Sequence, residues 1–229
     1  MAPSIRVRAA LLIAIGLSTA ATAGLAARAV AGSHRLPPSV LLSHSKCAGH
    51  ERWQIKTLSD DEADQVNKTA RTTTVDELRE NDTRPDKVSA KVGRIARVEF
   101  RRYRVRITLH QAFREDDGDL HVIIHDPHHD GEADPAHTMI IEFPNTNCEP
   151  QKSSTYAPLL QEAREKFAAF VKACTGYDGT FGSPVELHGH VTITGVGFWD
   201  IKHGNPQRGR APNDLELHPV LKFSRAKCD

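Results

Sequence analysis

Arg102-Tyr-Arg-Val-Arg-Ile-Thr-Leu-His110 decides the fold, because charged or polar residues alternate with apolar ones along this stretch. A period of two is typical of a β-strand with one buried face. The apolar face carries Tyr103, Val105, Ile107 and Leu109. The opposite face carries Arg102, Arg104, Arg106, Thr108 and His110. We therefore predict that a strand here lies with its apolar face against a core.

Further apolar segments follow this strand in a recognisable order. Residues 120–125 and 138–143 are predicted strands, and residues 156–174 are a predicted helix with the apolar stripe Leu159, Ala163, Phe167, Phe170 and Val171. Residues 185–198 and 215–223 complete the series as strands. Three strands, a helix and two strands are the order of the five-stranded Greek-key barrel called the OB-fold. The predicted fold is therefore mainly β with one core helix.

The N-terminal part of the chain differs in composition from the barrel. Residues 1–31 combine a basic start, an apolar middle and Ala-x-Ala patterns, which predicts a secretory signal peptide, with a membrane anchor as the alternative. Residues 32–88 are polar and are expected to wrap the barrel with short helices at 60–66 and 75–80. Residues 89–229 are assigned to the barrel domain. Either N-terminal alternative places the folded part outside the cytoplasm, in a secreted or periplasmic location.

The charge balance and the cysteines narrow the class of protein. Lys and Arg number 30 against 29 Asp and Glu, so no global basic field favours nucleic acid or an anionic membrane as partner. We expect association with a membrane only through an uncleaved N-terminal segment. The four cysteines predict two disulfides in an exported protein. We favour the pairs Cys148–Cys174 and Cys47–Cys228.

A group of histidines and acids is expected on the outward face of the barrel strands. Its members are His121, Glu142, Glu216 and His218 on the strands, with Asp200 and His203 in the loop that follows residue 198. Imidazole and carboxylate together suit zinc or manganese, with His121, His203, Glu216 and His218 as first ligands. His121, Glu142, Asp200, Glu216 and His218 are equally candidates for acid–base catalysis. The alternative is a set of cross-strand hydrogen bonds without chemistry.

Two further groups are candidates for binding. The loop 125–137 contains His125, His128, His129 and His137 with four acids, which suits a surface metal ion or a solvated insertion. Arg102, Arg104 and Arg106 form a ladder on the outward face, and Arg208 and Arg210 follow in a Gly- and Pro-rich loop. OB-folds commonly hold ligands on this face and these loops. Nucleic acid fits poorly, because the exposed positions lack aromatic rings for base stacking.

Three blocks of the chain resemble an uncharacterised family of exported bacterial proteins. The blocks are His50-Glu-Arg-Trp53 with Lys56-Thr57, the segment from Gly118-Asp119-x-His121 to Glu142-Phe-Pro144, and Val196-Gly-Phe-Trp-Asp200 continued by Glu216-Leu-His-Pro-Val220. The resemblance implies export and an OB-like barrel. It implies no activity.

These observations leave three hypotheses on function. The first is a non-catalytic exported binding module of unknown ligand. The second is a metal-dependent hydrolase of nuclease or phosphodiesterase type, with zinc or manganese as the candidate cofactor. The third is a structural or protein-interaction domain of the cell envelope. The sequence leaves the ligand, the oligomeric state and the presence of enzymatic activity open.

Overall fold

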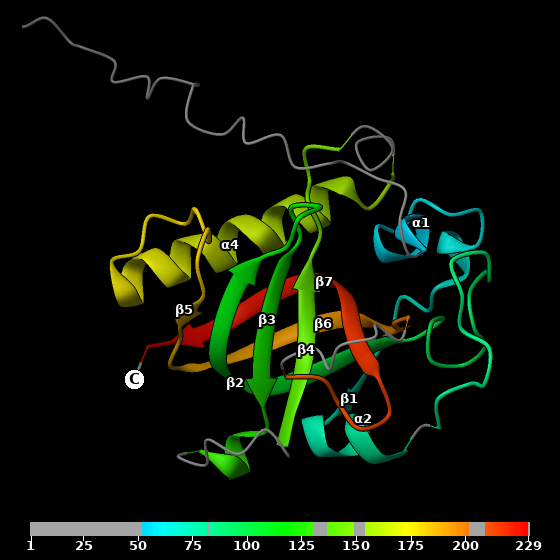
Figure 1. Cartoon of the computed structure of the whole chain (residues 1–229), viewed down its shortest axis with the longest axis horizontal. Helices are drawn as coiled ribbons and strands as arrows, with labels where there is room; N and C mark the ends of the chain where they lie inside the picture. Colours follow the sequence, from blue (N-terminus) through cyan, green and yellow to red (C-terminus); the bar gives the residue numbers. More distant parts are fainter. Residues whose placement is uncertain (1–51, 82, 131–136, 149–153, 202–208, 229) are drawn as a thin grey trace, which may run out of the picture. The chain divides into compact units, whose positions relative to one another are not determined.

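Five strands of the chain close into a barrel in the computed structural model, which describes residues 52–81, 83–130, 137–148, 154–201 and 209–228 (Figure 1). The strands are β2 (Arg102–Arg114), β3 (Leu120–His125), β4 (Thr138–Phe143), β6 (His190–Trp199) and β7 (Leu215–Lys227). β2 pairs antiparallel with both β3 and β6, β3 pairs with β4, and β7 joins β4 in parallel and β6 in antiparallel orientation. This closed order confirms the OB-fold-like Greek-key barrel.

The alternation of β2 places its apolar face in the core as predicted. Tyr103, Val105, Ile107 and Leu109 are each at most 2% exposed. The pairing of β2 with β3 shifts register between Leu109 and Gln111, which marks a β-bulge. The bulge allows one long strand to pair with β6 along its first part and with β3 along its second.

The core helix α4 spans Ala157–Thr175 between β4 and β6. It buries Leu160, Ala163, Phe167 and Val171 against the barrel and ends at Gly176, whose positive φ of 73° favours glycine. Leu159, which the sequence placed in the buried stripe, is 40% exposed. The stripe therefore begins one residue later than predicted, at Leu160.

Short elements surround the barrel. They include the helices α1 (Trp53–Lys56) and α2 (Val75–Asn81) and the 3₁₀ helices η1 (Ala63–Gln65) and η2 (Pro127–His129). Two short strands, β1 (Ala70–Thr73) and β5 (Val185–Glu186), both pair with β2. Sequence patterns anticipated helical structure near η1 and α2 but not β1, and the strand predicted over residues 185–198 is divided into β5 and β6. Thr74, which directly precedes α2, accepts a hydrogen bond from the backbone N–H of Glu77 at 3.1 Å.

Helices cover opposite ends of the barrel (Figure 1). At the end formed by the turn between β2 and β3, Arg164 of α4 donates hydrogen bonds to the backbone oxygens of Gly118 and Phe143. At the other end, the backbone N–H of Val75 in α2 donates to Asp126, and Arg79 donates to the backbone oxygen of Thr138. The N-terminal residues that are described therefore pack directly on the barrel.

The disulfide pairing differs from the prediction. Cys174 at the end of α4 bonds to Cys228 just after β7, so the pairs Cys148–Cys174 and Cys47–Cys228 are both wrong. The reason is that α4 packs along β7, which brings the end of the helix to the end of the last strand. Cys148 is also disulfide-bonded. Cys47 lies outside the described residues, as do residues 1–31 with the predicted signal peptide.

A membrane-spanning helix is not found among the residues that the structure describes, since none of their helices combines the necessary length and apolar character.

Candidate functional site

The strand register brings three of the predicted site residues together. His121 of β3 lies directly opposite Glu142 of β4 in the antiparallel pair. The parallel pairing of β4 with β7 sets Ile140 opposite Glu216 and Ile141 opposite Leu217, so that His218 follows beside Glu142. Glu142 is therefore flanked by two imidazoles from two different strands.

The carboxylate of Glu142 contacts both imidazoles. Its Oε1 is 3.0 Å from Nδ1 of His121, and its Oε2 is 2.8 Å from Nδ1 of His218. His121 Nδ1 is also 3.1 Å from Oε1 of Glu115. On the far side of the second imidazole, Nε2 of His218 is 3.4 Å from Oδ2 of Asp119. Asp119 was not among the predicted candidates, although it precedes His121 by two residues and so shares its face.

Three more groups complete what we call the buried polar cluster, made up of Lys56, Asp119, His121, Glu142, Asp200, Glu216 and His218. Lys56 of α1 places its Nζ 4.0 Å from Oδ1 of Asp200. Glu216 lies two residues before His218 on the same face of β7, and its Oε2 has no hydrogen-bond partner among the described residues. Lys56 was missed as a site residue because only the packing of α1 on the barrel brings it here.

The cluster is on the outward face of the strands and yet it is buried. Each of its residues is at most 5% exposed, and all six residues of β3 and of β4 are buried. Phe113 stacks on His121, and Phe198 meets His218 edge-on. A Cβ on Gly209 would lie 2.7 Å from Ile123, which shows how closely the segment before β7 covers this face.

Burial and charge set the protonation of the cluster. Burial lowers the pKa of His121, but its hydrogen bonds to Glu115 and Glu142 outweigh burial and raise the pKa to about 9. Burial likewise lowers the pKa of His218, and the Glu142 charge together with the close contacts to the carboxylates of Glu142 and Asp119 raises it to about 9. Both imidazoles are therefore protonated at neutral pH when no metal is bound.

The carboxyl groups of the cluster shift in opposite directions. Burial raises the pKa of Glu142, but His218 and Lys56 outweigh burial and hold it well below its ordinary value. Burial, with the charges of Asp200 and Glu142, raises the pKa of Glu216 well above its ordinary value. Burial lowers the pKa of Lys56, and the surrounding carboxylates raise it further than burial lowers it. The network thus favours the ionised form of Glu142 and the protonated form of Glu216.

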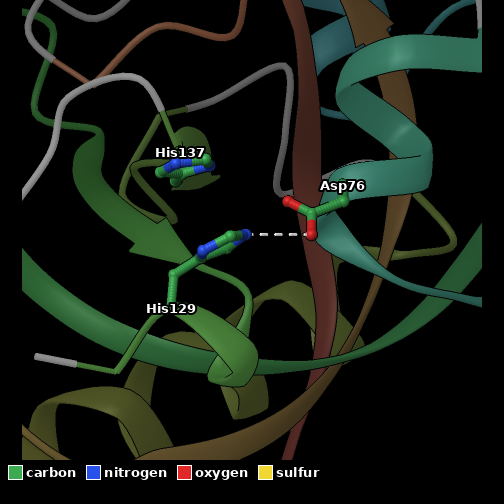
Figure 2. A group of neighbouring side chains, drawn as sticks. All are labelled: Asp76, His129 and His137. Atoms are coloured by element: carbon green, nitrogen blue, oxygen red, sulfur yellow. Dashed lines mark hydrogen bonds and ion pairs between the residues drawn. The ribbon is translucent and has the colours of Figure 1, made fainter. Parts of the chain in front are cut away.

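A second histidine group lies at the opposite end of β3, and Figure 2 shows its side chains. Nε2 of His129 is 3.1 Å from Oδ2 of Asp76 in α2, and the ring of His129 stacks on that of His137 with centroids 3.8 Å apart. Ligand atoms of these three residues lie within 4.8 Å of one another. Of the predicted loop histidines, His125 and His128 do not join this group. His128 instead contacts Asp126, and its side chain is 86% exposed.

A basic groove is the third feature, and it contains part of the predicted arginine ladder. The groove, with a volume of about 410 Å³, lies between α4 and the sheet. Its cationic residues are Lys68, Arg102, Arg104, Lys166 and Lys222, and its acidic residue is Glu162. Arg104 lies opposite Thr194 of β6, which in turn lies opposite Lys222 of β7, so these three side chains form a row across the sheet.

The remaining predicted binding residues lie apart from this groove. Arg106 is exposed on β2 but does not line the groove. Arg210 pairs with Asp214, with Nε 2.9 Å from Oδ1. Arg208 and the predicted ligand His203 lie outside the described residues.

Comparison of the chain with protein-family models, with curated proteins and with solved structures finds no match.

Proposed function

We propose that this chain is an exported, non-catalytic binding module that holds a compact anionic ligand in the basic groove. The observation that carries the proposal is the local charge: five cationic side chains face one carboxylate in the groove, while the whole chain has a formal charge of only +1. Such concentration of one sign of charge in a concave site attracts an oppositely charged ligand. The disulfide Cys174–Cys228 and the resemblance to an exported bacterial family support export.

Glu162, the one carboxylate among the described residues that line the groove, does little to neutralise it. Glu162 is paired with Lys166 one helical turn away on α4, which leaves Lys68, Arg102, Arg104 and Lys222 for a ligand. The guanidinium of Arg102 lies over the ring of Tyr156 at 5.4 Å, and its Nε has no hydrogen-bond partner among the described residues. Stacking on a ring fixes the plane of a guanidinium and thereby prepares it for a phosphate or carboxylate.

The groove favours a compact anion over nucleic acid. Phe223 is the one aromatic residue among those described as lining the groove, and it is only 3% exposed. Single-stranded nucleic acid is usually held by exposed rings on which bases stack. Leu159, 40% exposed, adds an apolar contact at the groove. A small ligand with two or more phosphate or carboxylate groups matches this combination.

The other two hypotheses receive less support. A hydrolase that used the buried polar cluster would need substrate to touch side chains that are at most 5% exposed. An interaction domain would be expected to present an apolar patch. Among the described residues, Leu159 is the large hydrophobic side chain that is exposed. Neither observation favours these functions over ligand binding in the groove.

The test is the affinity for inorganic pyrophosphate, measured calorimetrically at low salt, with citrate as a carboxylate probe. The double variant Arg104→Ala/Lys222→Ala is expected to weaken binding by about tenfold or more, because a hydrogen bond to a charged group contributes about 1.5 kcal/mol or more. Arg106→Ala is the matched control, since it removes an exposed arginine of the same strand outside the groove. Equal losses in both variants, or no binding of either probe by the wild type, would overturn the proposal.

A further inference from the structure

Three oxygen and nitrogen ligands converge within the buried polar cluster. One carboxylate oxygen each from Asp119 and Glu142 and one imidazole nitrogen of His218 lie within 4.8 Å of one another. All three residues are at most 2% exposed. We propose that Asp119, Glu142 and His218 bind a divalent cation, zinc or manganese, beneath the surface of the barrel. This site is separate from the basic groove, and the proposal does not depend on anion binding.

The contacts of His218 with the carboxylates of Glu142 and Asp119 lack the geometry of hydrogen bonds. Nδ1 of His218 is only 2.8 Å from Oε2 of Glu142, and yet neither atom has a hydrogen bond of acceptable geometry. The same holds for Nε2 of His218 and Oδ2 of Asp119 at 3.4 Å. In a hydrogen bond the acceptor lies close to the N–H direction.

Two ligands of one metal ion behave differently from a hydrogen-bonded pair. With metal–ligand bonds of about 2.0–2.2 Å in a tetrahedral site, neighbouring ligand atoms lie about 3.3–3.6 Å apart. Each ligand atom then lies well off the lone-pair direction of the other, because that direction points at the metal. The 3.4 Å between Nε2 of His218 and Oδ2 of Asp119 lies in this range, whereas the 2.8 Å between Nδ1 and Oε2 of Glu142 is shorter, so Nε2 is the nitrogen that would face the cation.

The electrostatics of the cluster is compatible with a bound cation. Four carboxyl groups, those of Asp119, Glu142, Asp200 and Glu216, are buried together with Lys56 and the imidazoles of His121 and His218. Buried carboxylates are costly unless they are paired with positive charge or coordinate a metal. The ammonium of Lys56 lies 4.0 Å from Oδ1 of Asp200, and its charge also acts on Glu142. A divalent cation bound between Glu142 and Asp119 would displace the proton of His218 and take over its pairing with these two carboxylates.

The surroundings orient the ligands in the manner of known metal sites. His121 binds Oε1 of Glu142 at 3.0 Å, and the backbone N–H of Asn145 donates to Oδ1 of Asp119 at 2.6 Å. Each carboxylate thus has one oxygen fixed by the protein and the other directed to His218. Hydrogen bonds of this kind to the ligands tune and orient metal sites. One nitrogen and two carboxylate oxygens suit zinc or manganese.

The test is elemental analysis of the untagged protein, purified without chelator. We expect stoichiometric zinc or manganese in the wild type and its loss in Asp119→Asn, which conserves side-chain volume. His129→Ala is the matched control, because it disrupts the surface group of Asp76, His129 and His137 but leaves the buried site intact. Asp126→Asn controls for the change of a buried carboxylate elsewhere on the barrel. Metal that is retained in Asp119→Asn and lost in His129→Ala would overturn the proposal.

A second measurement keeps the proposal testable if Asp119→Asn does not fold. Chelator-treated wild type is titrated with Zn²⁺ and Mn²⁺, and its melting temperature is followed. A rise that saturates with the first equivalent supports the site, provided that His129→Ala shows the same rise. The absence of metal in the purified protein, together with no thermal shift on titration, would overturn it. Pyrophosphate affinity of Asp119→Asn should be unchanged, so failure of this site is distinguishable from failure of the groove.

Discussion

The ion pair between Arg52 and Glu99 makes a sharp prediction, because both side chains are fully buried. The two oxygens of Glu99 accept hydrogen bonds from the guanidinium at 2.7 and 2.5 Å. They also accept the backbone N–H groups of Ile95 at 2.6 Å and Trp199 at 2.9 Å. Arg52 in turn donates to the backbone oxygen of Trp199. The pair therefore links the residue before α1 to the end of β6. Lys56 lies in α1 and Asp200 directly follows β6, so the pair also positions these two members of the buried polar cluster.

We predict that Glu99→Gln lowers the free energy of unfolding by about 3–5 kcal/mol, the usual cost of removing one partner of a buried ion pair. The amide conserves volume, but its NH₂ group faces N–H donors, and the buried guanidinium loses its counter-charge. Natural domains have total stabilities of about 5–15 kcal/mol, so the loss is a large fraction of the whole. With a urea m-value of about 2 kcal/mol/M, the unfolding midpoint should fall by about 2 M.

The assay is urea unfolding at pH 7, followed by tryptophan fluorescence. Glu162→Gln is the control, because it breaks an ion pair of the same kind on the exposed face of α4 and should leave the midpoint nearly unchanged. A double variant, Arg52→Met/Glu99→Leu, should lose less stability than Glu99→Gln, since no unpaired charge remains. A midpoint for Glu99→Gln equal to that of the control would refute the reasoning.

Two further predictions concern the pH dependence of the stability and the contribution of the disulfide to it. Chelator-treated protein should lose about 5 kcal/mol of stability between pH 6.5 and pH 9, roughly half of it from each of two histidines, because a histidine pKa that folding raises from 6.5 to about 9 stabilises fully below 6.5 and not above 9. Both His121 and His218 contribute, and urea midpoints that stay constant or rise over this range would contradict the prediction. The double variant Cys174→Ser/Cys228→Ser should lose about 2–4 kcal/mol, since the disulfide closes a separation of 54 residues. An unchanged urea midpoint in that variant would show that the loop is constrained by other contacts.

The barrel could be predicted because its strands carry local signals. Alternation in β2 fixed both the strand and the inward face of Tyr103 and Val105, and the strand–helix order fixed the Greek-key arrangement. The face of His121, Glu142 and His218 followed from the same alternation. Each of these signals repeats every two or four residues, so it is visible without knowledge of distant segments.

Other features could not be predicted, because they depend on contacts between distant segments. Alternation implied that half of β3 and β4 would be exposed, whereas α1 and the segment at Gly209 bury the outward face. Asp76 and Lys56 reach histidines or carboxylates only through tertiary packing. The disulfide of Cys174 depends on where α4 ends relative to β7. A pairing choice among four cysteines carries no local signal.

Acidic and basic residues are nearly equal in number in this chain, but they gather in different places on the barrel. Strand β7 contributes to both places. The first part of β7 contributes Glu216 and His218 to the buried polar cluster, while its second part contributes Lys222 to the basic groove. Between them the pairing of β7 with β6 shifts register at Gly195. Such irregularities bend and twist a strand, so its two halves face different surroundings. Acidic and basic groups thus occupy separate parts of one strand without neutralising each other. This separation would let the proposed cation site and the proposed anion site coexist on a small barrel whose net charge predicts neither.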